Sequence, residues 1–221
     1  EGYVQRVAEI CRQRDILLVA DEVMCGMGRT GKAFAVDHWK VEPDMITVGK
    51  GVASGYAPLG AVIVGPRVMQ AIIRGSATFQ HGFTYQNHPV AMAAGNAVLD
   101  VMEEQQLFAR VPQVSAQMLA ALARLQEHRH VGDVRGLGLL LAVEFVKDKL
   151  TGAPFSREEN IAGKIFQAAM DHGVLTYPTQ GCVDGVEGDH ILLAPPFIFT
   201  ADECNTTASA IAAALDQVFP R

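Results

Sequence analysis

Short apolar runs separated by amphipathic stretches mark the first part of the chain. Residues 3–14 place apolar side chains at helical spacing, which predicts a helix. The runs at 16–20, 45–48 and 59–64 are apolar and partly β-branched, which predicts three strands, the first of them buried. A helix near 66–74 follows the third strand. This part therefore combines strands with helices.

Two amphipathic helices open the second part, and strands and helices follow them. Pro89 is expected in the first turn of the first helix, because that turn leaves its N–H groups unpaired and proline has none. Thr200 and Asp202 predict the beginning of the last helix. The expected elements are helices at about 89–107 and 113–127, strands at 131–135 and 139–146, a helix at 157–171, a strand at 190–194 and a helix at 201–218.

This alternation indicates an α/β layer fold. The pattern changes near residues 108–112, which predicts a boundary between one domain over 1–108 and another over 109–221. The chain begins on an amphipathic helix, with no strand before it and no initiator methionine. We therefore expect an N-terminal part to be missing.

Composition argues against several classes of protein. The 221 residues are 49% hydrophobic and 19% charged, which argues against disorder, and the net charge of −6 argues against a nucleic-acid partner gripped through its phosphates. No stretch approaches the roughly 20 uninterrupted apolar residues that span a bilayer, so no membrane partner is expected. The four cysteines are far apart and include no C-x-x-C pair. They indicate neither a metal site nor a disulfide framework, and they fit a cytoplasmic location.

Two ionisable residues follow predicted strands. Asp21 closes the first strand, and Lys50 follows the second by two residues. Ligands of open α/β sheets bind at the carboxyl ends of strands, so both side chains would face one crevice if the strands were parallel neighbours. A lysine between Gly49 and Gly51 suits imine formation, and a carboxylate on the same rim can keep a ring nitrogen protonated, as pyridoxal phosphate (PLP) chemistry requires. An aspartate that caps a turn and a solvated loop lysine are the commoner alternative, and spacing alone leaves both open.

Several further motifs occur in a fixed order, and together they resemble the C-terminal half of the class III (ornithine/ω-amino acid type) PLP-dependent aminotransferases. The similarity covers essentially the whole chain. It implies an α/β protein of fold type I, with residues 1–108 in the large mixed-sheet PLP-binding domain and residues 109–221 as the small α+β domain. The motifs are Leu17-Leu18-Val19-Ala20-Asp21-Glu22-Val23, Gly28-Arg29-Thr30-Gly31, Pro43-Asp44, Gly49-Lys50-Gly51, Gly55-Tyr56-Ala57-Pro58-Leu59-Gly60-Ala61, His81-Gly82-Phe83-Thr84-Tyr85, Arg135-Gly136-x-Gly138-Leu139, Glu144-Phe145 and Ala194-Pro195-Pro196.

The resemblance implies a role for four residues. Asp21 matches the carboxylate that pairs with the pyridine nitrogen of PLP, and Val23 matches an apolar residue packed on one ring face. Lys50 matches the lysine that holds PLP as a Schiff base and then moves the proton during transamination. Thr84 matches a hydroxyl that binds the cofactor phosphate of the neighbouring subunit, which implies a homodimer with shared active sites. The implied substrates are a small-molecule amine donor and a keto acceptor.

The chain departs from this family at the substrate. Many members carry an arginine in the C-terminal domain that clamps a substrate carboxylate, but no lysine or arginine lies between Lys164 and Arg221 here. The missing clamp favours an amine, an ω-amino compound or a substrate with a bulky apolar part, and chain preceding Glu1 is the other place from which a clamp would come. The implied phosphate cup and the aromatic residue that stacks on PLP would come from chain preceding Glu1.

Other functions stay open at this point. A PLP-dependent decarboxylase or aminomutase has the same fold, and a non-catalytic fragment can keep the same motifs. Residues 26–31 also read G-x-G-x-x-G, the fingerprint of a dinucleotide-binding module. Against that alternative, five residues separate the first strand from the first glycine, and the following segment is a poor helix.

Overall fold

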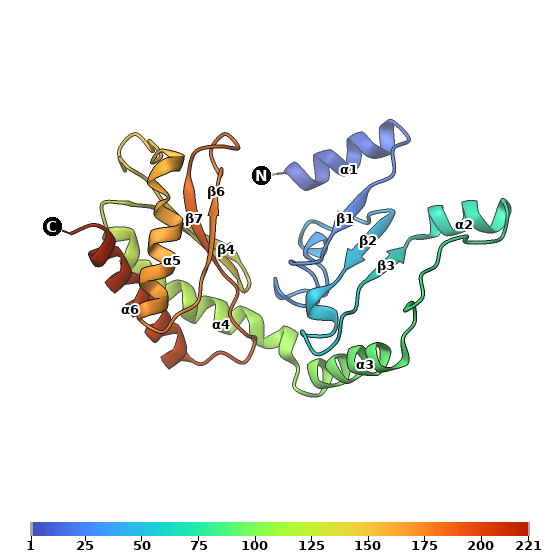
Figure 1. Ribbon diagram of the computed structural model, residues 1–221. Coiled ribbons are helices and arrows are strands. Elements are labelled where there is room, and N and C mark those ends of the chain that lie inside the picture. Colours follow the sequence, from blue (N-terminus) through green and yellow to red (C-terminus); the bar gives the residue numbers. More distant parts are fainter. Residues whose placement is uncertain (1, 221) are drawn as a thin grey trace. The chain divides into compact units, whose positions relative to one another are not determined.

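The computed structural model describes residues 2–220, which form two compact units, Glu1–Ala109 and Arg110–Arg221 (Figure 1). The division lies one residue from the boundary expected at 108/109. It falls within helix α4 (Leu107–Leu122), so the chain passes from one unit to the other without leaving the helix. That these units are a large PLP-binding domain and a small domain stays a prediction.

The first unit is built around a three-stranded sheet of order β1-β2-β3. Strand β1 runs parallel to β2, with Asp21 opposite Thr47, and β3 is antiparallel to β2. The helices are close to those expected from the sequence. The elements are α1 (Tyr3–Gln13), β1 (Val19–Asp21), η1 (Ala35–Trp39), β2 (Met45–Val48), η2 (Lys50–Val52), β3 (Ala61–Val64), α2 (Pro66–Arg74) and α3 (Pro89–Glu104).

The prediction of a buried strand over 16–20 was wrong in two ways. Strand β1 begins only at Val19, and the side chain of Val19 is 48% exposed. The strand lies at the edge of the sheet and pairs only with β2, so less of it is covered than of a central strand. Asp44 fixes the residue just before β1, because its Oδ2 accepts a hydrogen bond of 2.8 Å from the backbone N–H of Leu18.

The second unit is a four-stranded antiparallel sheet of order β4-β5-β7-β6. Alternate residues of β5 and β7, such as Val143 and Ile191, are fully buried, and they form one core with Met118 of α4, Ile165 of α5 and Ile211 of α6. The remaining elements are η3 (Ala123–Glu127), β4 (Val131–Leu137), β5 (Leu140–Phe145), η4 (Arg157–Glu159), α5 (Ile161–Asp171), β6 (Tyr177–Gln180), β7 (Asp189–Leu193) and α6 (Ala201–Val218).

The start of α6 agrees with the sequence prediction, whereas β6 and α4, which each contain a proline, differ from it. Thr200 caps α6, as the sequence predicted. Its hydroxyl accepts a hydrogen bond from the backbone N–H of Glu203, and its own N–H donates to the Glu203 side chain. Strand β6 was not expected, because Pro178 interrupts its pattern, but an edge strand tolerates a proline. Helix α4 begins six residues earlier than expected and runs through Pro112.

Together the two units confirm the expected mixed α/β architecture. Among the helices of residues 2–220, none combines the length and the apolar character that crossing a membrane requires.

Candidate functional site

The parallel pairing of β1 and β2 brings Asp21 and Lys50 to the same edge of the sheet. Asp21 is the last residue of β1 and lies opposite Thr47, and Lys50 begins η2 three residues after Thr47. The condition on which the sequence argument depended, that the two strands are parallel neighbours, is therefore met. Both side chains are exposed.

Hydrogen bonds orient the carboxylate of Asp21. Its Oδ1 accepts one from the backbone N–H of Val23 at 3.0 Å and one from the hydroxyl of Thr47 at 3.5 Å. One donor comes from the turn after β1 and the other from β2, so the carboxylate is fixed relative to both strands. The turn that orients Asp21 also carries Val23.

The glycines beside Lys50 allow the two loops to approach closely. A Cβ added to Gly49 would lie 3.4 Å from Cγ1 of Val23, and one added to Gly51 would lie 3.3 Å from Cβ of Met27. Lys50 itself has a φ of +41°, in the left-handed region that lysine rarely adopts. Close packing of the turn after β1 against residues 49–51 therefore brings Val23 beside the segment that carries Lys50.

Thr84 is placed differently from these three. It lies in a turn within the exposed segment 75–88, and its side chain is exposed. Helix α3 begins five residues later, at Pro89, so Thr84 lies outside the first turn of that helix. The free N–H groups of a helix start, which favour an anion, are therefore not adjacent to Thr84.

Glu22 is a residue of this region whose burial the sequence argument missed. Its side chain is 2% exposed, and its two carboxylate oxygens accept hydrogen bonds of 2.9 Å from the backbone N–H groups of Ala35 and Val36 at the start of η1. Glu22 follows the last residue of β1, and its burial depends on η1 lying over it, which no local sequence signal shows.

The thiol of Cys25 is altered by the same environment. Burial raises the pKa of Cys25 to about 12, and the neighbouring carboxylate of Glu22 acts in the same direction, because both disfavour the thiolate. Cys25 is therefore a neutral packing residue at ordinary pH, and a nucleophilic role for it has no support.

The G-x-G-x-x-G segment does not form a dinucleotide site. Residues 23–30 form turns after β1, and the next helical element is the short η1, so no α-helix begins at the glycines as the fingerprint requires. Gly28 instead has a φ of +87°, and a Cβ on it would lie 2.2 Å from the ring of Phe108. Gly28 therefore allows the left-handed backbone of this turn and its close contact with Phe108.

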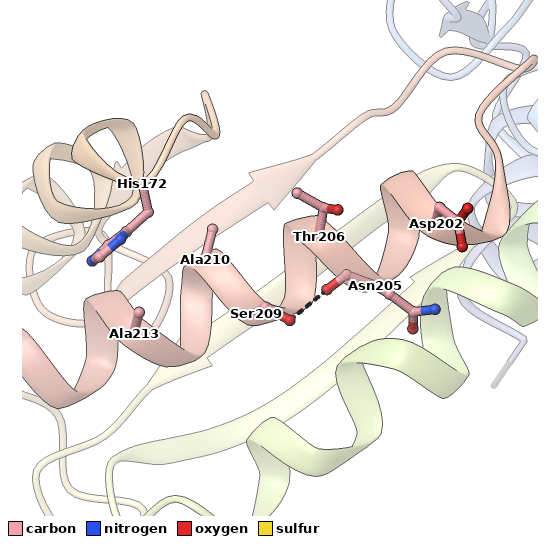
Figure 2. Close-up of a pocket in the computed structure, with 7 residues that line it drawn as sticks. All are labelled: His172, Asp202, Asn205, Thr206, Ser209, Ala210 and Ala213. Carbon is pink, nitrogen blue, oxygen red and sulfur yellow. Dashed lines mark hydrogen bonds between the residues drawn. The ribbon is translucent and has the colours of Figure 1, made fainter.

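A hollow on the second unit lies far along the sequence from these residues. Its volume is about 570 Å³, and Figure 2 shows it along α6, beside His172 at the end of α5. Ser209 donates its hydroxyl to the backbone oxygen of Asn205, so that hydroxyl is engaged within the helix. None of the four predicted site residues lines this hollow. Its lining is His172, Asp202, Asn205, Thr206, Ser209, Ala210 and Ala213.

Comparison with known proteins supports the resemblance seen in the sequence. A family model for class III aminotransferases matches residues 1–215. Over 203 residues the chain is 37% identical to an uncharacterized aminotransferase, YodT of Bacillus subtilis, and the match covers 91% of this chain and 46% of that protein. Over 204 residues it is 36% identical to the chloroplastic gamma aminobutyrate transaminase 3 of Solanum lycopersicum, with 91% and 38% covered.

Solved structures agree. An amine transaminase from an uncultivated Pseudomonas species, in its PLP-bound form, matches with a TM-score of 0.88 and 37% identity, covering 99% of this chain and 48% of that one. The fold expected from the resemblance is thereby confirmed. The chain spans about half the length of this protein, or less in the case of the tomato relative. No finding favours a decarboxylase, an aminomutase, a non-catalytic fragment or a dinucleotide-binding module.

The raised pKa of Cys25 predicts slow alkylation. At pH 8 a thiol of pKa about 12 is ionised in on the order of one molecule in 10,000, far less than an ordinary cysteine. We expect iodoacetamide to label Cys25 at least about tenfold more slowly in the folded protein than in urea. Glu22→Gln should speed the labelling, because it removes a negative charge that raises the pKa. Peptide mass mapping measures both rates, and equal labelling in the folded and unfolded protein would contradict the assignment.

Proposed function

The chain belongs to the class III aminotransferase family, whose members use PLP, and we propose that this protein moves an amino group from an amine or ω-amino compound to a keto acid or aldehyde. The observation that carries the proposal is the pairing of β1 with β2. It puts the carboxylate of Asp21 and the amine of Lys50 at the carboxyl ends of neighbouring parallel strands.

The residues present fit PLP. The amine of Lys50 is exposed between two glycines, and the carboxylate of Asp21 is exposed on the same edge while Oδ1 is held by two hydrogen bonds. When bound, PLP supplies an electron sink for the electrons released at the substrate carbon. The carboxylate of Asp21 would accept a hydrogen bond from the protonated pyridine nitrogen and so strengthen that sink.

Lys50 has two tasks in the proposed reaction. Its amine would hold the cofactor covalently, and once the substrate amine had replaced it there, Nζ of Lys50 would carry a proton to and from the substrate carbon. Val23 lies against Gly49 and supplies an apolar surface beside this amine. An apolar neighbour suits one face of an aromatic ring.

The charge pattern supports an amine or ω-amino compound as donor. A planar arginine is the residue type that best holds a substrate carboxylate, yet no lysine or arginine lies between Lys164 and Arg221. Among the similar solved structures is the (S)-enantioselective ω-transaminase of Thermomicrobium roseum, with 37% identity and a TM-score of 0.88. An ω-amino donor for this chain is in keeping with that enzyme's description as an ω-transaminase.

The quaternary state and location are parts of the same proposal. We infer a homodimer in which Thr84 of one subunit binds the cofactor phosphate of the other. The exposed position of Thr84 supports this, because a residue that serves a neighbouring subunit must be accessible from outside its own chain. The four cysteines are unpaired, which supports a reducing, cytoplasmic environment.

Covalent trapping tests the role of Lys50. Borohydride reduction of the purified protein with PLP should add the mass of one reduced cofactor to the peptide that contains Lys50, because reduction makes an imine bond permanent. Lys50→Ala should lose the added mass and at least about a thousandfold of the amino-transfer rate, while Lys32→Ala, in the turn before η1, should keep both. Trapping on another lysine, or none in the presence of PLP, would refute the assignment.

Mixing of two variants tests the shared site. Lys50→Ala and Thr84→Ala subunits, co-expressed, should form mixed dimers in which one of the two sites keeps both residues. Statistical assortment then gives about a quarter of the wild-type activity at limiting PLP, above either variant alone. No recovery on mixing would show that Lys50 and Thr84 do not serve one site across a subunit boundary.

A further inference from the structure

Glu22 is a buried carboxylate placed directly after a proposed catalytic residue. An ionised carboxylate with 2% exposure is costly unless hydrogen bonds compensate for the lost water. Glu22 meets this need with one backbone N–H on each oxygen, from Ala35 and Val36, both at 2.9 Å. It therefore fastens the end of β1 to a segment 13 and 14 residues further along the chain.

The backbone of Glu22 makes two more connections. Its N–H donates to the carbonyl oxygen of Thr47 on β2 at 3.0 Å, and its carbonyl oxygen accepts from the N–H of Gly26 at 2.9 Å. A Cβ on Gly26 would lie 2.7 Å from that oxygen and 3.0 Å from Cβ of Glu22, so the turn closes tightly over Glu22. One residue thus joins β2, η1 and the turn after β1.

The turn that Glu22 fastens is the surface on which the Lys50 segment rests. Val23 and Met27 extend from this turn against Gly49 and Gly51, the residues on either side of Lys50. Lys50 has a φ of +41°, a backbone conformation that a lysine keeps only when its surroundings hold it. Val23 also donates its N–H to Asp21, so the same turn orients both proposed catalytic side chains.

We propose that Glu22 is a positioning residue for the aminotransferase site: its buried carboxylate fixes the turn 22–31, and through Val23 and Met27 this turn holds Lys50 and Asp21 in their working arrangement. The inference rests on the proposed function. Glu22 acts through other residues, without contact to substrate or cofactor.

The test compares Glu22→Gln with Asp44→Asn in the purified protein. Asp44 is a matched control, because its carboxylate also accepts a backbone N–H (that of Leu18), but at the opposite end of the β1–β2 pair from Lys50. The change to glutamine would keep the size of the side chain while turning one acceptor into a donor that faces an N–H. The readouts are the PLP dissociation constant, the yield of borohydride-trapped cofactor on Lys50 and the melting temperature.

We expect Glu22→Gln to weaken PLP binding at least tenfold and to lower the trapped yield in proportion. Asp44→Asn should leave PLP binding within twofold of wild type, even if it lowers the melting temperature as much as Glu22→Gln does. If Glu22→Gln does not accumulate as folded protein, Glu22→Asp replaces it under the same criteria, since it keeps the charge but shortens the reach. The shorter acid should also bind PLP less tightly.

Two results would overturn the inference. Unchanged PLP binding in the Glu22 variant would show that the turn does not position Lys50, and an equal loss in Asp44→Asn would show only general destabilisation. Both results are informative only if borohydride traps the cofactor on Lys50 in the wild-type protein. A wild-type protein without that trapping would instead refute the proposed function, so the two failures are distinguishable.

Discussion

The parallel pairing of β1 with β2 is the constraint on which the candidate site depends. Carboxyl ends of parallel neighbours meet at one edge of a sheet, and here those ends carry Asp21 and the segment that begins with Lys50. An antiparallel pairing of the same strands would put the two residues at opposite edges. The pair consists of a three-residue and a four-residue strand, which form few hydrogen bonds with each other. Contacts around the two strands therefore help to hold them in this arrangement.

Those contacts are of two kinds, and they act at opposite ends of the strand pair. At the entry of β1, Asp44 ties Leu18 to the start of β2. At the exit, the buried Glu22 and the tightly packed glycines bring the turn 22–31 against residues 49–51. The site therefore consists of a few reactive groups on the exposed edge, held by the contacts of Glu22 and the glycines at the exit of β1. Buried polar groups of this kind specify one arrangement when each is satisfied.

The sequence could predict the parts of the molecule that local signals determine. Periodicity and capping located α1, α2 and α6 to within a residue, and the turn chemistry of Thr200 is as expected. Strand β6 was missed because Pro178 is acceptable only at an edge, and edge position is a property of the sheet. The burial of Glu22 is likewise a property of the tertiary structure, because it depends on η1 folding back over this residue. The placement of Thr84 relative to a neighbouring subunit is a question that no single chain answers, and it stays a prediction.

A crystal structure of the protein grown with PLP would show where the cofactor lies relative to the β1–β2 edge. We expect continuous density from Nζ of Lys50 to the cofactor, with a carboxylate oxygen of Asp21 within hydrogen-bond distance of the pyridine nitrogen. Cofactor bound at this edge with Asp21 turned away, or bound to a different lysine, would contradict this expectation.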